Sequence, residues 1–172
     1  MGKSKDFPER YGNLRKEILS IAKKRILVLD GAMGTMIQKR SLTEDDFRNG
    51  APFANCSKEL KGNNDCLNLT RPDIIEEIHA EYIDAGADII TTNTFSSNRI
   101  SQSEYGLEEY ASLLALHGAK IARKAADKAN EEFLRTGFAR KVFVAGSMGP
   151  TSKSLSLAPD ISDPSFRHYS FD

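Results

Sequence analysis

Three short apolar segments, separated by longer helical patterns, constrain this chain more than any other feature. They cover residues 25–30, 88–95 and 141–145. Short, nearly continuous apolar runs are typical of parallel strands that are buried on both faces. Between these segments, and before the first, apolar residues recur at helical spacing. The alternation predicts an α/β fold in which right-handed crossovers join parallel strands.

The helical patterns carry boundary signals. Four helices are predicted, over residues 9–24, 41–48, 71–85 and 104–134. In the third, Thr70 is the expected cap, Pro72 lies in the first turn, and Asp73 follows Thr70 by three residues as in a capping box. Gly86 is the expected stop. Residues 31–35, which contain two glycines, are predicted to form a tight loop.

Three strands fit either an open doubly wound sheet or the first part of a (β/α)8 TIM barrel. A complete barrel typically needs about 250 residues and eight strands. The chain has 172 residues and supplies three strands, so a barrel interpretation requires a truncated one, with about three βα units. We expect residues 1–8 to be a disordered lead and residues 9–172 to form one domain.

Composition excludes several classes of protein. Lys and Arg number 24, as do Asp and Glu, and this balance argues against a nucleic-acid partner. No apolar run approaches the roughly 18 residues that cross a bilayer, and the polar N-terminus does not resemble a signal peptide. Two cysteines are fewer than a secreted disulfide scaffold carries. We therefore expect a cytoplasmic protein without a membrane partner.

Small and polar residues gather where each predicted strand ends. The candidate binding residues are Asp30, Gly31, Met33, Gly34, Thr92, Asn93, Ser147, Met148 and Gly149. In a barrel the carboxyl ends of the strands share one face, which is where active sites lie. The Asp30 carboxylate suits an ammonium group, and free N–H groups of the glycine loop suit a carboxylate. The pattern predicts a pocket for a small molecule.

These residues also have purely structural interpretations. Asp30 can cap its loop, and Thr92 and Asn93 can shape theirs through hydrogen bonds. The glycine segment is neither GxGxxG nor a P-loop, so nucleotide binding is not favoured. Cys56 and Cys66 are separated by nine residues without a CxxC, and we expect no metal site there.

Four segments resemble the homocysteine-binding module of cobalamin-dependent methionine synthases. They are residues 29–38, 61–73, 85–95 and 145–151, and the tail segments 158–167 and 170–172 resemble it too. Asp30-Gly31 and the Asn-Thr-Phe at 93–95 are shared with the wider homocysteine S-methyltransferase family, which includes betaine-dependent enzymes. The Lys-Gly-Asn-Asn-Asp at 61–65 and the tail are more particular to methionine synthases.

The resemblance implies a TIM barrel that binds homocysteine and a zinc ion, which holds the homocysteine sulfur as a thiolate. The methyl group is implied to come from cobalamin on another domain, recharged by 5-methyltetrahydrofolate on a folate domain. The candidate residues match family positions at the three strand ends. Asp30 and Gly31 match those that hold the amino-acid end of homocysteine, and Met33 and Gly34 those that shape the loop.

The family's zinc ligands are three cysteines on later strands, two of them adjacent, and this chain has no Cys-Cys pair. We therefore expect the chain alone to bind neither zinc nor cobalamin and to be inactive. Two alternatives remain open. One is a stand-alone homocysteine methyltransferase that uses betaine or a sulfonium donor. The other is a non-catalytic fragment that self-associates through unpaired strand edges and uncovered apolar surface.

Overall fold

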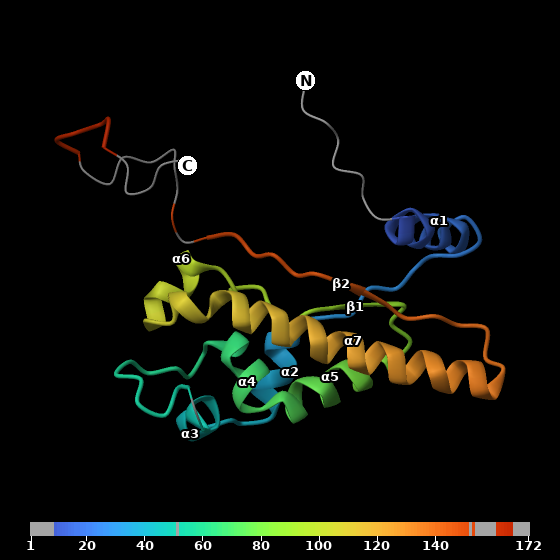
Figure 1. Ribbon diagram of the computed structural model, residues 1–172, viewed down its shortest axis with the longest axis horizontal. Helices are drawn as coiled ribbons and strands as arrows, with labels where there is room; N and C mark the ends of the chain where they lie inside the picture. The colour runs from blue at the N-terminus through green and yellow to red at the C-terminus, as the bar shows by residue number, and fades with distance from the viewer. Residues whose placement is uncertain (1–8, 51, 152, 154–160, 167–172) are drawn as a thin grey trace.

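The computed structural model describes residues 9–50, 52–151, 153 and 161–166 (Figure 1). Its helices, 3-10 turns and strands are α1 Glu9–Ala22, α2 Met33–Lys39, α3 Glu44–Arg48, η1 Asn64–Cys66, α4 Leu67–Thr70, α5 Pro72–Asp84, β1 Ile89–Thr91, α6 Arg99–Gln102, η2 Ser103–Tyr105, η3 Glu108–Tyr110, α7 Ala111–Thr136 and β2 Phe143–Ala145. The chain is α/β and mostly helical, with a small parallel sheet. The expected lead at 1–8 and most of the tail lie outside the described residues.

The sheet has the predicted parallel arrangement. Strands β1 and β2 pair with Ile89 opposite Phe143 and Thr91 opposite Ala145. Leu29 adds a single parallel bridge to Ile89 on the other edge of β1. The connections through α5 and through α7 place both helices on one side of the strands, whereas α1 lies apart from them (Figure 1).

The first predicted strand is wrong in its extent and its burial. Residues 25–30 form only the one bridge at Leu29 rather than a strand. The Ile26, Val28 and Leu29 side chains are 87%, 51% and 56% exposed. The physical reason is that the described residues supply a neighbouring strand on one side only, so this segment is an edge.

The core lies between the sheet, α5 and α7. The predicted stripe of the last helix is largely confirmed, because Leu114, Ile121, Ala122 and Ala125 are buried. The alanines bring the α7 backbone close to Ile90, which is fully buried in β1. Burial of an Ile or Leu side chain contributes about 1.5–3 kcal/mol, so this seam fixes the strands on the helices.

Two helix starts differ from the prediction. Thr70 does not cap α5; it ends α4, where its hydroxyl donates to the Cys66 carbonyl at 3.3 Å, and Arg71 takes the cap position. The expected loop at 31–35 is also wrong, because α2 begins at Met33. Although the two glycines favour a loop, the segment forms a helix because Met33, Met36 and Ile37 pack against the core.

Candidate functional site

A single carboxylate positions the loop that follows α3. Glu44 accepts hydrogen bonds from the backbone N–H of Leu60 at 2.9 Å and of Lys61 at 2.6 Å. Glu44 also pairs with Arg48, whose guanidinium donates to the carbonyls of Cys56 and Lys58. These bonds hold the loop so that Gly62 and the residues after it turn toward the strand ends.

A cavity of about 360 Å³ lies at the carboxyl ends of the strands. Its lining comes from the segment after 25–30, the 62–65 segment, the end of β1 with the residues that follow it, η2 and the segment after β2. The lining residues are Gly31, Met33, Gly34, Gly62, Asn63, Asn64, Asp65, Thr91, Thr92, Asn93, Phe95, Ser96, Tyr105 and Ser147. Segments far apart in the sequence therefore meet at one site, as the strand-end argument predicts.

Buried amides hold the cavity wall together. Asn93 donates to the Asn64 carbonyl at 2.8 Å and to the Asn68 side chain at 3.0 Å. Asn68 donates in turn to the carbonyls of Asn93 at 2.7 Å and Leu114 at 3.2 Å. A Cβ on Gly118 would lie 2.7 Å from the Asn68 amide nitrogen, so α7 approaches this network closely. Such satisfied buried networks keep a site rigid.

A second amide pair lies beside the same cavity. Asn63 and Gln102, both buried, exchange hydrogen bonds of 2.8 and 3.2 Å. Gln102 also donates to the Ser96 carbonyl at 3.0 Å. The Asp65 carboxylate accepts from the Ser96 N–H at 2.9 Å and the Ser97 hydroxyl at 2.7 Å. Burial raises the pKa of Asp65, and these two hydrogen bonds oppose the rise.

Six of the nine predicted residues line the cavity: Gly31, Met33, Gly34, Thr92, Asn93 and Ser147. Gly31 packs directly on Tyr82, since a Cβ there would lie 3.0 Å from the Tyr82 hydroxyl oxygen. Thr92 accepts from the Ser147 N–H at 2.9 Å, which ties the end of β1 to the turn after β2.

Asp30, Met148 and Gly149 are not among the lining residues. Asp30 accepts from the Thr91 N–H at 2.7 Å and the Thr91 hydroxyl at 3.0 Å, as its structural interpretation predicts. Burial raises the pKa of Asp30, and the bonds from Thr91 oppose this. Met148 is 94% exposed. The Gly149 N–H donates to the Phe95 carbonyl at 2.9 Å, a contact that leaves no room for a side chain.

Sequence reasoning did not name eight of the lining residues. They are Gly62, Asn63, Asn64, Asp65, Thr91, Phe95, Ser96 and Tyr105. One signal was available, because the segment 61–65 stood out in the resemblance to methionine synthases. Its turn-like composition hid its role, since such loops are more often simple connections.

The described residues do not fit a zinc ion. No group of three His, Cys, Asp or Glu side chains among them is arranged to hold a metal. Burial raises the pKa of the Cys66 thiol to about 12, so without a metal ion it is protonated at neutral pH. Cys56 donates its S–H to the Tyr105 carbonyl at 3.6 Å. The His79 side chain is fully buried.

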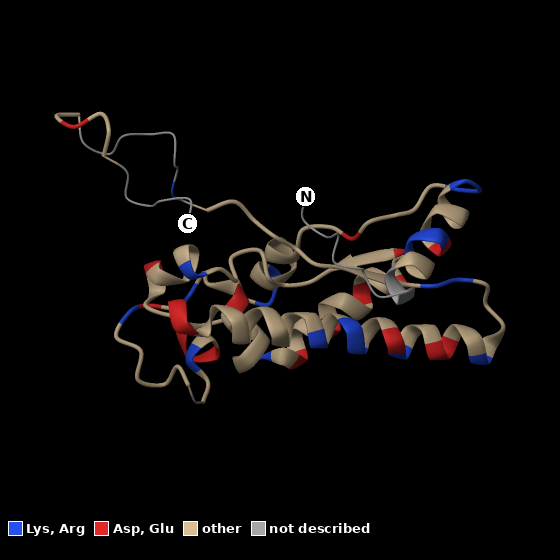
Figure 2. Cartoon of the chain, turned by 45° about the horizontal axis from the view of Figure 1, so that its top comes forward, with Lys and Arg blue, Asp and Glu red and all other residues tan. Residues whose placement is uncertain are grey.

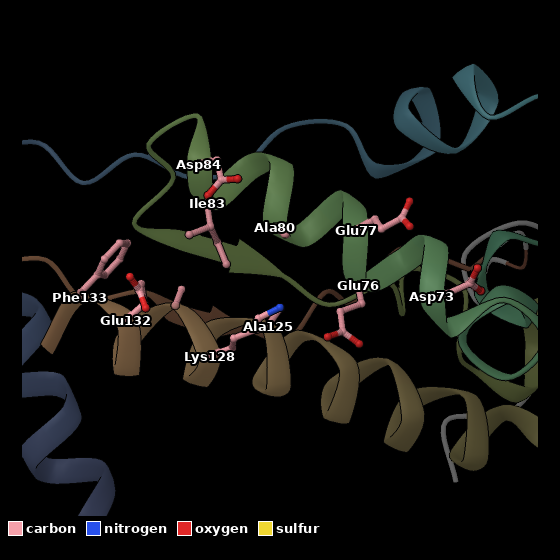
Figure 3. A pocket seen from close by; sticks show the side chains of 11 residues that line it. Asp73, Glu76, Glu77, Ala80, Ile83, Asp84, Ala125, Lys128, Glu132 and Phe133 are labelled. Carbon is pink, nitrogen blue, oxygen red and sulfur yellow. The ribbon is translucent and has the colours of Figure 1, made fainter. Parts of the chain in front are cut away.

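A larger hollow of about 600 Å³ lies between α5 and α7 (Figure 3). Small and apolar side chains alternate there with carboxylates. Four of these carboxylates are already paired: Glu76 with Lys124 at 2.7 Å, Glu132 with Arg135 at 2.6 Å, Asp73 with Arg71 at 2.9 Å and Glu77 with Arg40 at 3.7 Å. None of the residues at the strand ends lines this hollow. We therefore place the candidate site in the smaller cavity, where polar groups converge from several strands.

Two further features bear on possible partners. Lys and Arg residues alternate with Asp and Glu along the second half of α7 (Figure 2). No helix within the described part of the chain has both the length and the apolar character that a membrane span requires.

Comparison with known proteins shows the family to which the chain belongs. The family model described as homocysteine S-methyltransferase matches residues 27–172. The homocysteine methyltransferase MmuM from Escherichia coli is similar in its metallated form, with 26% identity and a TM-score of 0.55 over 76% of this chain. The oxidized form of the same enzyme shows 28% sequence identity and a TM-score of 0.52 over 73% of this chain. The chain spans 40% and 37% of those two structures. Because the family model covers most of its length, the protein belongs to the homocysteine S-methyltransferase family.

Proposed function

We propose that this chain supplies the amino-acid-binding part of an enzyme that methylates the thiol of homocysteine. One observation carries the proposal: glycine, amide and hydroxyl groups from three strand ends line one cavity in a chain of this family. A cavity of about 360 Å³ suits a small ligand. Its amide networks are rigid, which favours a fixed ligand orientation.

The chain's own residues would bind and orient the substrate. Gly31 and Gly34 allow a carboxylate to approach the backbone N–H groups closely. Asp30 fixes the strand end through Thr91 and, as the family positions imply, lies beside the amino-acid end of homocysteine. Thr92, together with Asn93, would form the wall against which the ligand packs. The segment after β2 would form the third side of the binding site, with Ser147, Met148 and Gly149.

We propose further that the enzyme is a cobalamin-dependent methionine synthase built on a TIM barrel. The segment 61–65 supports this choice over a betaine or sulfonium enzyme, because it resembles methionine synthases in particular. We assign zinc, cobalamin and the folate domain of this proposed enzyme to residues outside these 172. The free thiols of Cys56 and Cys66 suit a cytosolic enzyme.

The test is a methyl-donor assay on the whole protein. Labelled methyl groups are offered on 5-methyltetrahydrofolate with cobalamin, on betaine and on S-methylmethionine, and labelled methionine is measured. We expect transfer from the folate with cobalamin only. Transfer from betaine or the sulfonium compound alone would replace the methionine synthase assignment while keeping the family. No transfer to homocysteine from any donor would contradict the proposed activity.

A further inference from the structure

Asp65 differs from every other residue that lines the strand-end cavity. It is the one carboxylate among the lining residues, which otherwise bring amides, hydroxyls, glycines, a Met, a Phe and a Tyr. No Lys, Arg or His lines the cavity. Asp65 is 3% exposed, so its charge is held in a buried environment beside the cavity.

The hydrogen bonds of Asp65 use only one of its oxygens. Oδ2 accepts from the Ser96 N–H at 2.9 Å and from the Ser97 hydroxyl at 2.7 Å. Oδ1 accepts no hydrogen bond from the described protein residues. Asp30 is different, because Thr91 occupies both of its oxygens and Asp30 lies outside the cavity lining. Asp65 therefore has one oxygen that no described protein group donates to, whereas both oxygens of Asp30 accept from Thr91.

The charge of Asp65 has no cationic partner at the site. Transfer of a carboxylate from water into a protein interior is unfavourable unless a cation or several donors compensate. Two donors on one oxygen compensate in part, and burial still raises the pKa of Asp65. A ligand that carries an ammonium group would complete the compensation.

We propose that Asp65 binds the α-ammonium group of the amino-acid substrate through its free Oδ1. The inference rests on the proposed function, since it takes the cavity to hold homocysteine. It assigns the recognition of the ammonium to a carboxylate on the 62–65 loop, in addition to Asp30 at the strand end. The competing explanation is that Asp65 only anchors the turn at Ser96 and Ser97.

The experiment compares two ligands that differ by the amino group. Binding of L-homocysteine and of 4-mercaptobutanoate, which lacks the ammonium, is measured by titration calorimetry on the whole protein. The variant Asp65→Asn keeps the shape and an oxygen that can accept from Ser96, but it removes the charge. The control variant Ser97→Ala removes one anchoring hydrogen bond and keeps the charge.

We expect Asp65→Asn to weaken homocysteine binding about 10- to 100-fold and to change 4-mercaptobutanoate binding less than about twofold. Ser97→Ala should change both ligands by the same factor. Equal weakening of both ligands by Asp65→Asn, or no weakening of either, would overturn the inference and leave the proposed function in place. Failure of the wild-type protein to bind either ligand would overturn the proposed function, and the inference with it.

A second measurement does not depend on the folding of a variant. Carboxyl carbons of aspartate are labelled in the wild-type protein, and the pKa of Asp65 is followed by NMR with and without ligand. An ammonium beside Oδ1 stabilises the carboxylate, so homocysteine should lower the pKa of Asp65. The ligand without the amino group should not lower it. A pKa that responds equally to both ligands would contradict the proposal.

Discussion

Two segments with similar apolar patterns differ in their burial in the folded molecule. Residues 25–30 and 88–93 each place apolar residues beside an aspartate. In the second segment Ile90 is fully buried between β2 and the helices. In the first segment the Val28 and Leu29 side chains are more than half exposed. An apolar pattern predicts that a strand can form, but its neighbours decide whether the strand is buried.

The hydrogen bonds show the same difference. Backbone groups of β1 pair on both edges, with β2 on one side and with Val28 and Asp30 on the other. Within the described residues, the N–H and C=O of Leu29 make no hydrogen bond. The Arg25 guanidinium holds this edge by a two-point ion pair with Asp88, at 2.6 and 2.7 Å. The first segment is thus attached through side chains and one bridge, while β1 is attached through the sheet and the core.

The largest expected effect tests this contrast directly. Ile90→Ala should lower the free energy of unfolding by about 2–5 kcal/mol, because it opens a cavity in a packed core. Leu29→Ala should cost less than about 1 kcal/mol, since the Leu29 side chain is 56% exposed. Urea unfolding of both variants measures the difference. If both variants lost the same free energy of unfolding, the two segments would be packed equally well, which would contradict the difference in burial.

A buried histidine on the packed side gives a pH dependence. His79 is fully buried, and neither ring nitrogen has a hydrogen-bond partner among the described residues. Burial lowers its pKa from 6.5 to about 4, and the nearby Glu76 charge opposes this. The unfolded chain therefore binds a proton at a higher pH than the folded chain. Stability contributed by neutral His79 is complete above pH 6.5 and is lost as the pH falls toward 4.

The size of this loss is on the order of 3 kcal/mol. It is measured by urea unfolding at pH 7, 5.5 and 4 for the wild type and for His79→Leu, which cannot titrate there. Acidic residues contribute to the pH dependence of both proteins, so the difference between them isolates His79. A difference that stays constant from pH 7 to pH 4 would show that His79 does not titrate in this range.

A close approach of α7 links the core to the cavity. A Cβ on Gly118 would lie 2.6 Å from the Thr94 side chain and 3.2 Å from the Asn93 carbonyl. Gly118→Ala should lower the free energy of unfolding by about 1–3 kcal/mol, despite the higher helix propensity of alanine. Gly12→Ala in α1, where the added Cβ meets nothing within 4 Å, is the matched control and should not destabilise. Thermal unfolding compares the two variants. If Gly118→Ala were as stable as the wild type, α7 would not pack closely at this position.

Local patterns predicted the elements whose stability is local. The apolar spacing of α7 and the helix stop at Gly86 carry their signals within a few residues. Parallel strands bring their carboxyl ends together whatever the side chains are. Six of the nine expected residues accordingly line one cavity at the strand ends.

The remaining features depend on distant partners. Asn63 pairs with Gln102, which is 39 residues away, and no local pattern indicates that pair. In the sequence Asp65 has the character of a turn residue, and only the structure shows that Ser96 and Ser97 donate hydrogen bonds to it. Asp30 accepts hydrogen bonds on both oxygens from Thr91, which is 61 residues away in the sequence. The hydrogen-bond partners of these side chains are distant in the sequence, so local sequence patterns do not predict them.

The smallest expected effect on stability concerns the exposed edge itself. We propose that the apolar edge formed by Ile26, Val28 and Leu29 drives self-association of this chain, because an unpaired, apolar edge is a template for pairing. Ile26→Lys should change the free energy of unfolding by less than about 0.5 kcal/mol, since this side chain is 87% exposed. The charge should nevertheless shift the chain toward the monomer in light scattering at micromolar concentration. Leu134→Lys, at a similarly exposed position on α7, is the control and should leave association unchanged. A monomeric wild type, or equal dissociation by both variants, would mean that this edge attracts no partner copy.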